Sequence, residues 1–247
     1  MKISIITVCY NSSATIENTF KSVSSQTYKD IEYIVIDGGS TDSTLDLIEK
    51  YKNNITYWVS ESDKGLYDAM NKGISKATGD YIGILNADDV FNDDFVISNM
   101  ADFFKKNSVD VNVANIKQIN NKGNVIRLYS SKKWKPNKLC IGFMPPHPSI
   151  FVKREVFKKY GNYRLDFKIG ADYEFLTRIF LVHNVSWKYF NLTTHRMLIG
   201  GVSSSGVKSY IIITDEICKS LKINNVKFSP WLIKYRIIWK LKELIFK

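Results

Sequence analysis

Tyr81-Ile82-Gly83-Ile84-Leu85-Asn86-Ala87-Asp88-Asp89 is the stretch around which the rest of the chain is organised. Its first half is a short apolar run after Gly79-Asp80, which predicts a buried strand. Its second half becomes polar and acidic where that strand would end, and in an open α/β sheet ligands bind at the carboxyl ends of the strands. Adjacent carboxylates repel each other, so we expect Mg²⁺ or Mn²⁺ to pair with them. The alternative is a solvated turn in which an aspartate caps a helix.

Strand and helix patterns alternate before this stretch. Predicted strands cover 3–8, 31–36 and 55–59, and predicted helices cover 14–24, 43–51 and 66–77. This order predicts parallel βαβ units, which place the polar strand ends 7–11, 37–42 and 86–89 along one edge of a sheet.

The second half of the chain has a looser pattern. We predict a proline-rich extended segment at 144–148 and a mobile Gly/Ser-rich segment at 193–206. The other expected elements are helices at 95–104, 155–160, 172–181 and 207–221, strands at 109–113, 149–152 and 185–190, and a hairpin turn at 120–123. The expected division is a domain at 1–205, with halves 1–90 and 91–205, and a helical extension at 206–247.

Composition limits the partners of the chain. The 247 residues carry a net charge of +11, which points to nucleic acid, an anionic membrane or phosphate-bearing substrates. Cys9, Cys140 and Cys218 are far apart, as expected in a reducing compartment without a disulfide framework. The sequence begins without a signal-peptide pattern and no apolar run approaches the roughly 20 residues of a spanning helix, so we expect a cytoplasmic protein.

The last helix, predicted from Pro230 to Lys247, has a narrow charged face and a wide apolar one. The charged face carries Arg236, Lys240, Glu243 and Lys247, and the apolar face includes Trp231, Leu232, Tyr235, Ile238, Trp239, Ile245 and Phe246. A basic amphipathic helix of this kind suits the inner-membrane surface, where the protein would be peripheral. The alternatives are docking on the domain core or a dimer contact.

Five motifs, in order, resemble inverting glycosyltransferases of the large family 2, and among them the bacterial surface-polysaccharide enzymes. They are Ile6–Asn11, Val35–Asp42, Asp63–Gly73, Leu85–Asp89 and Ile169–Phe175. The resemblance implies the GT-A fold, a Rossmann-like α/β architecture with a mostly parallel central sheet, flanking helices and here a C-terminal amphipathic helix. It implies metal-dependent transfer of a hexosyl or N-acetylhexosaminyl group from a UDP-sugar to a glycan or lipid-linked acceptor, with Mn²⁺ or Mg²⁺ as cofactor.

The same resemblance assigns roles around the donor. Asp37 matches the residue that contacts the base, and Thr7, Tyr10 and Asn11 match residues that flank it. Asp88 would bridge ribose and metal and Asp89 would bind or orient the metal, with the direct ligand left open, while Asn86 stands where many members have Asp. The residues alone leave open that Asp37 only closes an Asx-turn before Gly38.

The resemblance also assigns roles to residues of the later motifs and loops. The diphosphate would be approached by Lys64, Asn71 and Lys72, although Met70 stands where many relatives have arginine. The alternative is that the two lysines are solvated side chains of the helix surface. Asp172 matches the general base, with Glu174 as a second candidate, although an aspartate is favoured at a helix start in any case. His195 would reach the metal or diphosphate from a closing lid, and His147 lies in the proline-rich loop.

Two other functions compete with this one. A nucleotidyltransferase would carry a glycine-rich basic loop after the first strand, but Tyr10-Asn11-Ser12-Ser13 has neither glycine nor a basic residue. A nucleic-acid-binding protein would cluster its basic residues with exposed aromatic side chains, whereas here they are dispersed. We therefore expect no nucleic-acid partner. The oligomeric state stays open.

Overall fold

The computed structural model describes residues 1–199 and 207–236 and divides into two compact units. The first unit contains Met1–Lys132, Pro145–Tyr163 and Val185–Ile199, and the second contains Lys133–Met144, Arg164–Asn184 and Gly200–Lys247. The second unit therefore includes two internal segments besides the predicted extension 206–247. The predicted halves 1–90 and 91–205 stay predictions.

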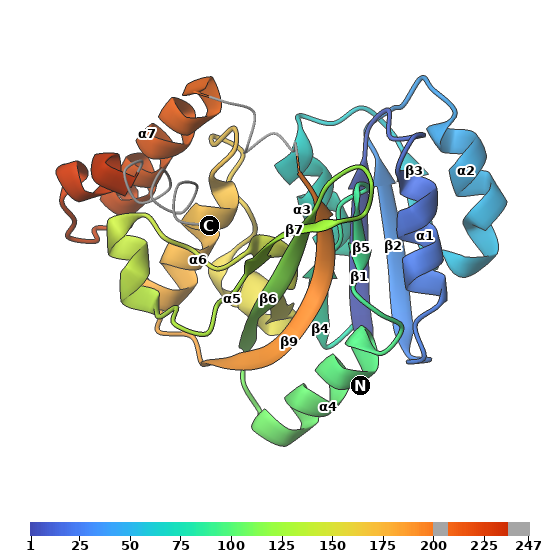
Figure 1. Cartoon of the computed structure of the whole chain (residues 1–247), viewed down its shortest axis with the longest axis horizontal. Helices are drawn as coiled ribbons and strands as arrows, with labels where there is room; N and C mark the ends of the chain where they lie inside the picture. The colour runs from blue at the N-terminus through green and yellow to red at the C-terminus, as the bar shows by residue number, and fades with distance from the viewer. Residues whose placement is uncertain (200–206, 237–247) are drawn as a thin grey trace. The chain divides into compact units, whose positions relative to one another are not determined.

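The first unit is built on a sheet with nine strands among the described residues (Figure 1). The strand order is β3-β2-β1-β4-β8-β6-β9-β5, with β7 paired to β6. The strands are β1 Ile3–Cys9, β2 Ile31–Asp37, β3 Tyr57–Ser60, β4 Tyr81–Ile84, β5 Asp89–Phe91, β6 Val111–Ile119, β7 Val125–Tyr129, β8 Phe151–Lys153 and β9 Trp187–Leu198. From β3 to β4 all neighbours are parallel, as predicted, whereas the remaining pairs are antiparallel except for β6 with β9.

Helices cover both faces of the parallel part. They are α1 Ile16–Ser24, α2 Thr44–Tyr51, α3 Leu66–Lys76, α4 Val96–Asn107 and α5 Arg154–Tyr160, with 3-10 turns at Lys52–Asn54 and His147–Ser149. Side chains alternate between faces along a strand. Ile3 and Ile5 therefore join the buried cluster that contains Phe20 of α1, while Ile6 faces α3. The predicted α/β class is confirmed.

Helix α3 packs very closely against β1 through Gly73. A Cβ atom at position 73 would lie 2.4 Å from Cγ2 of Ile6, which real side chains do not tolerate. Glycine costs some helix stability but permits this approach. The contact fixes the position of α3 over the sheet.

The structure corrects three local predictions. Strand β5, which begins at Asp89, was not expected. Strand β9 continues to Leu198, so residues 193–198 belong to a strand rather than to a mobile segment, while 200–206 lie outside the described residues. His147 begins a 3-10 turn instead of an extended segment, and its ring nitrogen Nε2 lies 2.8 Å from the hydroxyl of Tyr163.

The second unit is helical in its described part. It contains a 3-10 segment Pro136–Ile141, α6 Ala171–Thr177, a π-helical turn Arg178–Val182 and α7 Val207–Ile223. The Glu216 carboxylate accepts hydrogen bonds from the backbone N–H groups of Lys168, Ile169 and Gly170 at 2.6, 3.0 and 2.8 Å. An acidic side chain of α7 therefore holds the loop that leads into α6.

The predicted final helix is described only over residues 230–236, and Lys240, Glu243 and Lys247 lie outside the described residues. Arg236 is buried and donates from Nη1 to the carbonyl oxygen of Gly142 at 2.7 Å, which favours the alternative of a docked helix at this position. Trp231, Leu232 and Tyr235 are 71%, 55% and 56% exposed. None of the helices within 1–199 and 207–236 has the length and apolar content to cross a bilayer.

Candidate active site

The carboxyl ends of the parallel strands lie side by side in the first unit. Cys9 of β1 pairs with Asp37 of β2, and Asp37 pairs with Ser60 of β3. On the other side, Ile6 of β1 pairs with Ile84 of β4. The three polar strand ends predicted from the sequence are thus brought to one edge of the sheet.

Asp37 is completely buried and its carboxylate is surrounded by donors. Oδ2 accepts from the N–H groups of Gly39 and Ser40 at 3.0 and 2.9 Å and from the Ser60 hydroxyl at 2.6 Å. Burial alone would raise the pKa of Asp37, but the hydrogen bonds from Ser40 and Ser60 outweigh it and hold the pKa below its usual range. This geometry is the Asx-turn alternative, and the predicted base contact remains untested.

A second carboxylate lies above the same turn. A Cβ atom at Gly38 would be 2.5 Å from Oδ2 of Asp63 and 3.5 Å from Cδ2 of Tyr10. The other oxygen of Asp63, Oδ1, accepts from the N–H of Gly65 at 2.7 Å, and the Tyr10 ring is 63% exposed. Sequence reasoning missed Asp63. The glycine at 38 was the available signal, because it leaves room for a side chain from another strand end.

Thr7 lies within β1 and Asn11 lies after it; both are held by hydrogen bonds inside the first unit, and their predicted nucleotide contacts stay predictions. Thr7 is fully buried and its hydroxyl accepts from Tyr33 at 3.0 Å. Asn11 adopts a positive φ of 47° and its Oδ1 accepts from the N–H of Thr41 at 2.9 Å. Asn11 therefore ties the loop after β1 to the loop after β2, which supports the position of Tyr10.

Asn86, Asp88 and Asp89 form the acidic end of β4. Asp89 is 1% exposed, and its side chain has few donors: Nδ2 of Asn86 lies 3.4 Å from Oδ2, and the backbone N–H of Leu198 is a second, weaker partner. Oδ1 of Asp89 and Oδ1 of Asn86 are buried there without a hydrogen-bond partner. Burial, followed by the negative charge of Asp88, raises the pKa of Asp89 well above its usual range. The desolvation of its carboxyl group also raises the pKa of Asp88, although the residue as a whole is exposed.

These oxygen atoms fit a hard divalent cation. Buried polar atoms without partners are rare and costly, and Mg²⁺ and Mn²⁺ favour carboxylate and amide oxygens. Within residues 1–199 and 207–236, no three His, Cys, Asp or Glu side chains form a group that would hold a metal ion alone. A cation here would therefore complete its coordination with water or substrate oxygens.

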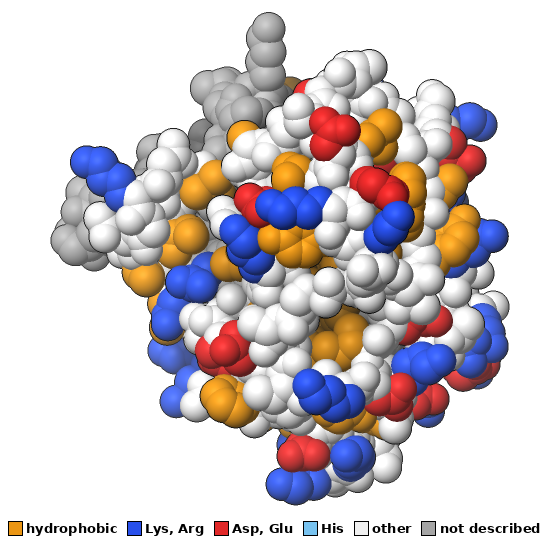
Figure 2. Space-filling model, turned by 90° about the vertical axis from the view of Figure 1, so that its right-hand side faces the viewer, with side chains coloured by type: hydrophobic (Ala, Val, Ile, Leu, Met, Phe, Trp, Pro, Cys, Tyr) orange, Lys and Arg blue, Asp and Glu red, His pale blue; other side chains and the backbone are white. Residues whose placement is uncertain are grey.

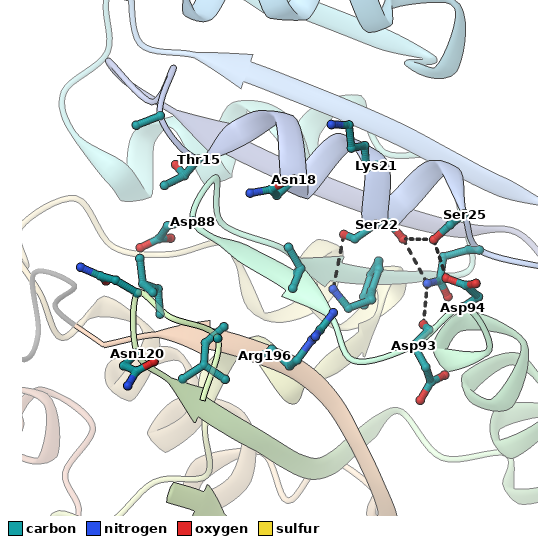
Figure 3. A pocket seen from close by; sticks show the side chains of 18 residues that line it. Thr15, Asn18, Lys21, Ser22, Ser25, Asp88, Asp93, Asp94, Asn120 and Arg196 are labelled. Atoms are coloured by element: carbon teal, nitrogen blue, oxygen red, sulfur yellow. Dashed lines mark hydrogen bonds between the residues drawn. The ribbon is translucent and has the colours of Figure 1, made fainter. Parts of the chain in front are cut away.

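A cavity of about 650 Å³ lies beside Asp88 in the first unit. Figure 3 shows Asp88 and Asn120 toward one end and Asp93 and Asp94 toward the other, with Arg196 between them. Asn18, Lys21 and Ser22 of α1 line the facing wall, and Val90 and Leu198 add apolar surface. The volume is typical of ligand pockets, and the mixed lining suits a ligand with many hydroxyl groups.

The side chains of α3 and the loop before it are engaged within the first unit. Asn71 makes two hydrogen bonds to the backbone of Tyr163, at 2.7 and 3.0 Å. Lys72 pairs with Glu61 at 2.8 Å, which raises the pKa of the lysine, and Lys64 is exposed. The predicted diphosphate contacts of these three residues stay predictions.

His195 does not lie on a lid. It is part of β9, 1% exposed, with Nδ1 2.8 Å from the Thr194 hydroxyl and Nε2 buried without a partner among the described residues. Burial lowers its pKa to about 3, with a smaller contribution from His147. The lid prediction is wrong, because alternating polar side chains of a half-buried strand resemble a loop in the sequence.

The two base candidates lie in the second unit. Asp172 is the second residue of α6, and its Oδ1 accepts from the N–H of Tyr173 at 2.7 Å. Glu174 is buried and paired with Arg178 at 3.0 Å, with Asn224 also bound to it. The second candidate is therefore used in a buried ion pair.

Comparison with known proteins agrees with this architecture. A family profile described as "Glycosyl transferase family 2" matches residues 4–167. An "Uncharacterized glycosyltransferase" of Mycobacterium tuberculosis is 32% identical over 200 residues, covering 73% of this chain and 69% of that protein. A "PGL/p-HBAD biosynthesis glycosyltransferase" of Mycobacterium bovis is 28% identical over 228 residues, covering 90% and 84%.

A solved structure shares the fold. Staphylococcus aureus TarS in complex with UDP-GlcNAc superposes with a TM-score of 0.72 at 19% identity, covering 94% of this chain and 70% of that one. At that identity the likeness speaks for the GT-A fold only. With the family profile and the polar strand ends described above, it leads to one conclusion: the chain belongs to glycosyl transferase family 2.

Proposed function

We propose that the protein is a metal-dependent, inverting transferase that moves a hexosyl or N-acetylhexosaminyl group from a UDP-sugar to a glycan or lipid-linked acceptor in surface-polysaccharide synthesis. The observation that carries the proposal is the pair of unpartnered buried oxygens on Asn86 and Asp89, next to Asp88. A bound Mn²⁺ or Mg²⁺ would supply Lewis-acid stabilisation of the leaving diphosphate. The residues that would hold it are Asp88 and Asp89, with Asn86 beside them.

The uracil preference rests on Asp63, Gly38 and Tyr10. The exposed Tyr10 ring offers a surface on which a planar base stacks, and the Asp63 carboxylate lies over Gly38 next to it. A carboxylate accepts from the imide N–H of uracil, whereas the corresponding ring nitrogen of cytosine is an acceptor and is repelled. In this proposal Asp37 positions the turn and Asp63 selects the base.

A binding panel tests the base assignment. We expect the protein with Mn²⁺ to bind UDP about 100-fold more tightly than CDP, because mismatched polar groups cost that much in a closed site. Asp63→Asn should lose most of this discrimination, since an amide also donates to cytosine. The matched control is Asp46→Asn, an exposed aspartate of α2. Unchanged discrimination in Asp63→Asn would contradict the assignment.

The role of Asp172 rests on the family resemblance and on its position at the start of α6. Asp172→Asn is expected to lower transfer by about 10³-fold and to leave UDP binding intact, because a general base acts only in the chemical step. Glu174→Gln is the matched control and should lower thermal stability instead, since it breaks the buried pair with Arg178. Near-normal turnover of Asp172→Asn would exclude it as the base.

The protein is proposed to be cytoplasmic and peripheral at the inner-membrane surface, where lipid-linked acceptors lie. The exposed Trp231, Leu232 and Tyr235 support this proposal, since aromatic and apolar side chains of that kind favour the interfacial region. Trp231→Ser with Tyr235→Ser is expected to weaken binding to anionic vesicles. Substitutions are a better test than removal of the tail, because the buried Ile233 and Arg236 also belong to it.

A further inference from the structure

The hairpin formed by β6 and β7 exposes aliphatic side chains of its second strand. Val125, Ile126 and Leu128 of β7 are 55%, 40% and 55% exposed. The pairing register shifts between Gln118 and Ile119, so the regular alternation of faces is interrupted between Val125 and Arg127. Within the residues that the structure describes, β7 pairs with β6 alone. Exposed aliphatic groups that are concentrated in one short edge strand indicate an interaction surface.

The same hairpin is basic and lacks acidic residues. Residues 111–132 contain Lys117, Lys122, Arg127 and Lys132 and no aspartate or glutamate. Lys122 and Lys132 are exposed, and the guanidinium of Arg127 lies 5.1 Å from the centre of the Tyr129 ring. By contrast, the face drawn in Figure 2 shows basic side chains interspersed with acidic ones. The sequence of the hairpin is therefore basic throughout.

These two properties decide between possible partners. A second copy of the chain paired along β7 would bring basic strands together without an acidic partner, which is unfavourable. Nucleic acid would be expected to meet exposed aromatic side chains for stacking, whereas the exposed groups here are aliphatic. An anionic lipid surface satisfies both properties, because its headgroups attract lysine and arginine and its acyl boundary accepts aliphatic side chains.

We propose that the β6–β7 hairpin, residues 111–129, is a membrane-contact element that inserts Val125, Ile126 and Leu128 into the interfacial region of an anionic bilayer. Asn120, Asn121 and Gly123 of its turn line the cavity beside Asp88. Contact through β7 therefore brings the bilayer surface to the mouth of that cavity. The membrane contact itself depends on neither a donor nor transferase activity.

Vesicle sedimentation of the full chain tests the proposal. The probes are phosphatidylcholine vesicles with and without phosphatidylglycerol. The variant Val125→Ser/Ile126→Ser/Leu128→Ser is expected to partition about tenfold less onto the anionic vesicles. Lys122→Gln/Arg127→Gln should lose the preference for phosphatidylglycerol and much of the salt dependence. The matched control is Phe95→Ser, which removes a 59% exposed side chain outside the hairpin and should bind as the wild type does.

A second measurement separates membrane contact from other effects. Backbone amides of 125–129 are expected to exchange more slowly with phosphatidylglycerol vesicles than without them, and circular dichroism should show that the variants remain folded. Leu128→Ser alone serves if the triple variant unfolds. The proposal is overturned if the hairpin variants bind like the wild type, or if only Trp231→Ser/Tyr235→Ser reduces binding. It is also overturned if the hairpin variants change the oligomeric state in ultracentrifugation while vesicle binding is unchanged.

Discussion

Asp37 and Asp89 are buried aspartates near the carboxyl ends of parallel strands in one sheet, but their pKa values shift in opposite directions. Asp37 receives hydrogen bonds from two backbone N–H groups and from side chains, whereas Asp89 has only a long hydrogen bond from Asn86 and a weak one from the backbone of Leu198. Burial is common to both, so the supply of donors makes the difference. Asp37, which has many donors, is part of the framework, whereas Oδ1 of Asp89 has no partner among the described residues, which supports the cation proposed there.

The largest expected effect is on catalysis, and it tests the part of the comparison that concerns Asp89. Asp89→Asn should reduce transfer by about 10³-fold, since in the proposed function it removes an oxygen ligand of the cation that would stabilise the leaving group. Its melting temperature without metal should be unchanged or higher, because an unpaired buried carboxylate is lost. Nucleotide-release assays and thermal unfolding with and without Mn²⁺ measure the two quantities. A large fall in stability without metal would show that Asp89 is a framework residue after all.

The next largest effect is on stability, and it tests the role of Asp37, the other aspartate of the comparison. Asp37→Ala should lower the free energy of unfolding by about 2–4 kcal/mol, because the donors that now bind the carboxylate are left unpaired. Urea unfolding followed by circular dichroism measures this change. Asp46→Asn, on an exposed face of α2, should stay within about 0.5 kcal/mol. If Asp37→Ala were as mild as this control, the distinction drawn from donor supply would fail.

The effect that is smallest near neutral pH extends the comparison to a buried cation-forming group. His195 has a folded pKa of about 3, below the ordinary 6.5, so the unfolded chain binds its proton more readily. Its contribution to stability is therefore full above pH 6.5 and declines as the pH falls toward 3, by up to about 1.4 kcal/mol per pH unit. Urea unfolding of wild type and His195→Asn across this range measures the difference. Parallel pH profiles for the two proteins would show that His195 does not titrate as its burial requires.

The first four strands and their helices could be predicted because long β-branched runs alternate with amphipathic segments. The position of Asp88 and Asp89 followed from the same pattern, since it depends only on where β4 ends. Strand β5 could not be predicted, because three residues carry no periodicity and its formation depends on pairing with distant β9. His195 was placed in a loop for a related reason: the polar residues Thr193 and Thr194 conceal a strand whose partners are far away in sequence.

The direction in which side chains point was the second feature that could not be predicted from the sequence. The helical pattern placed Arg236 on a basic face, but the structure turns it to the Gly142 carbonyl, and no periodicity in one helix reveals a carbonyl on another segment. Asp63 was overlooked in the same way. Its position matters only because Gly38, at the end of a different strand, has no side chain. The sequence could thus predict strand ends, but not which loop supplies a functional group to its neighbour.

Gly38 also suggests how donor preference changes within such a scaffold. Its φ is not among the positive values of the chain, so the backbone accommodates other residues once Asp63 is shortened. An acid could therefore be transferred between the two loops by a reciprocal exchange, Gly38→Asp with Asp63→Gly, without disturbing β2. Either change alone would crowd or empty the same space, which makes the two positions a natural pair for compensatory evolution.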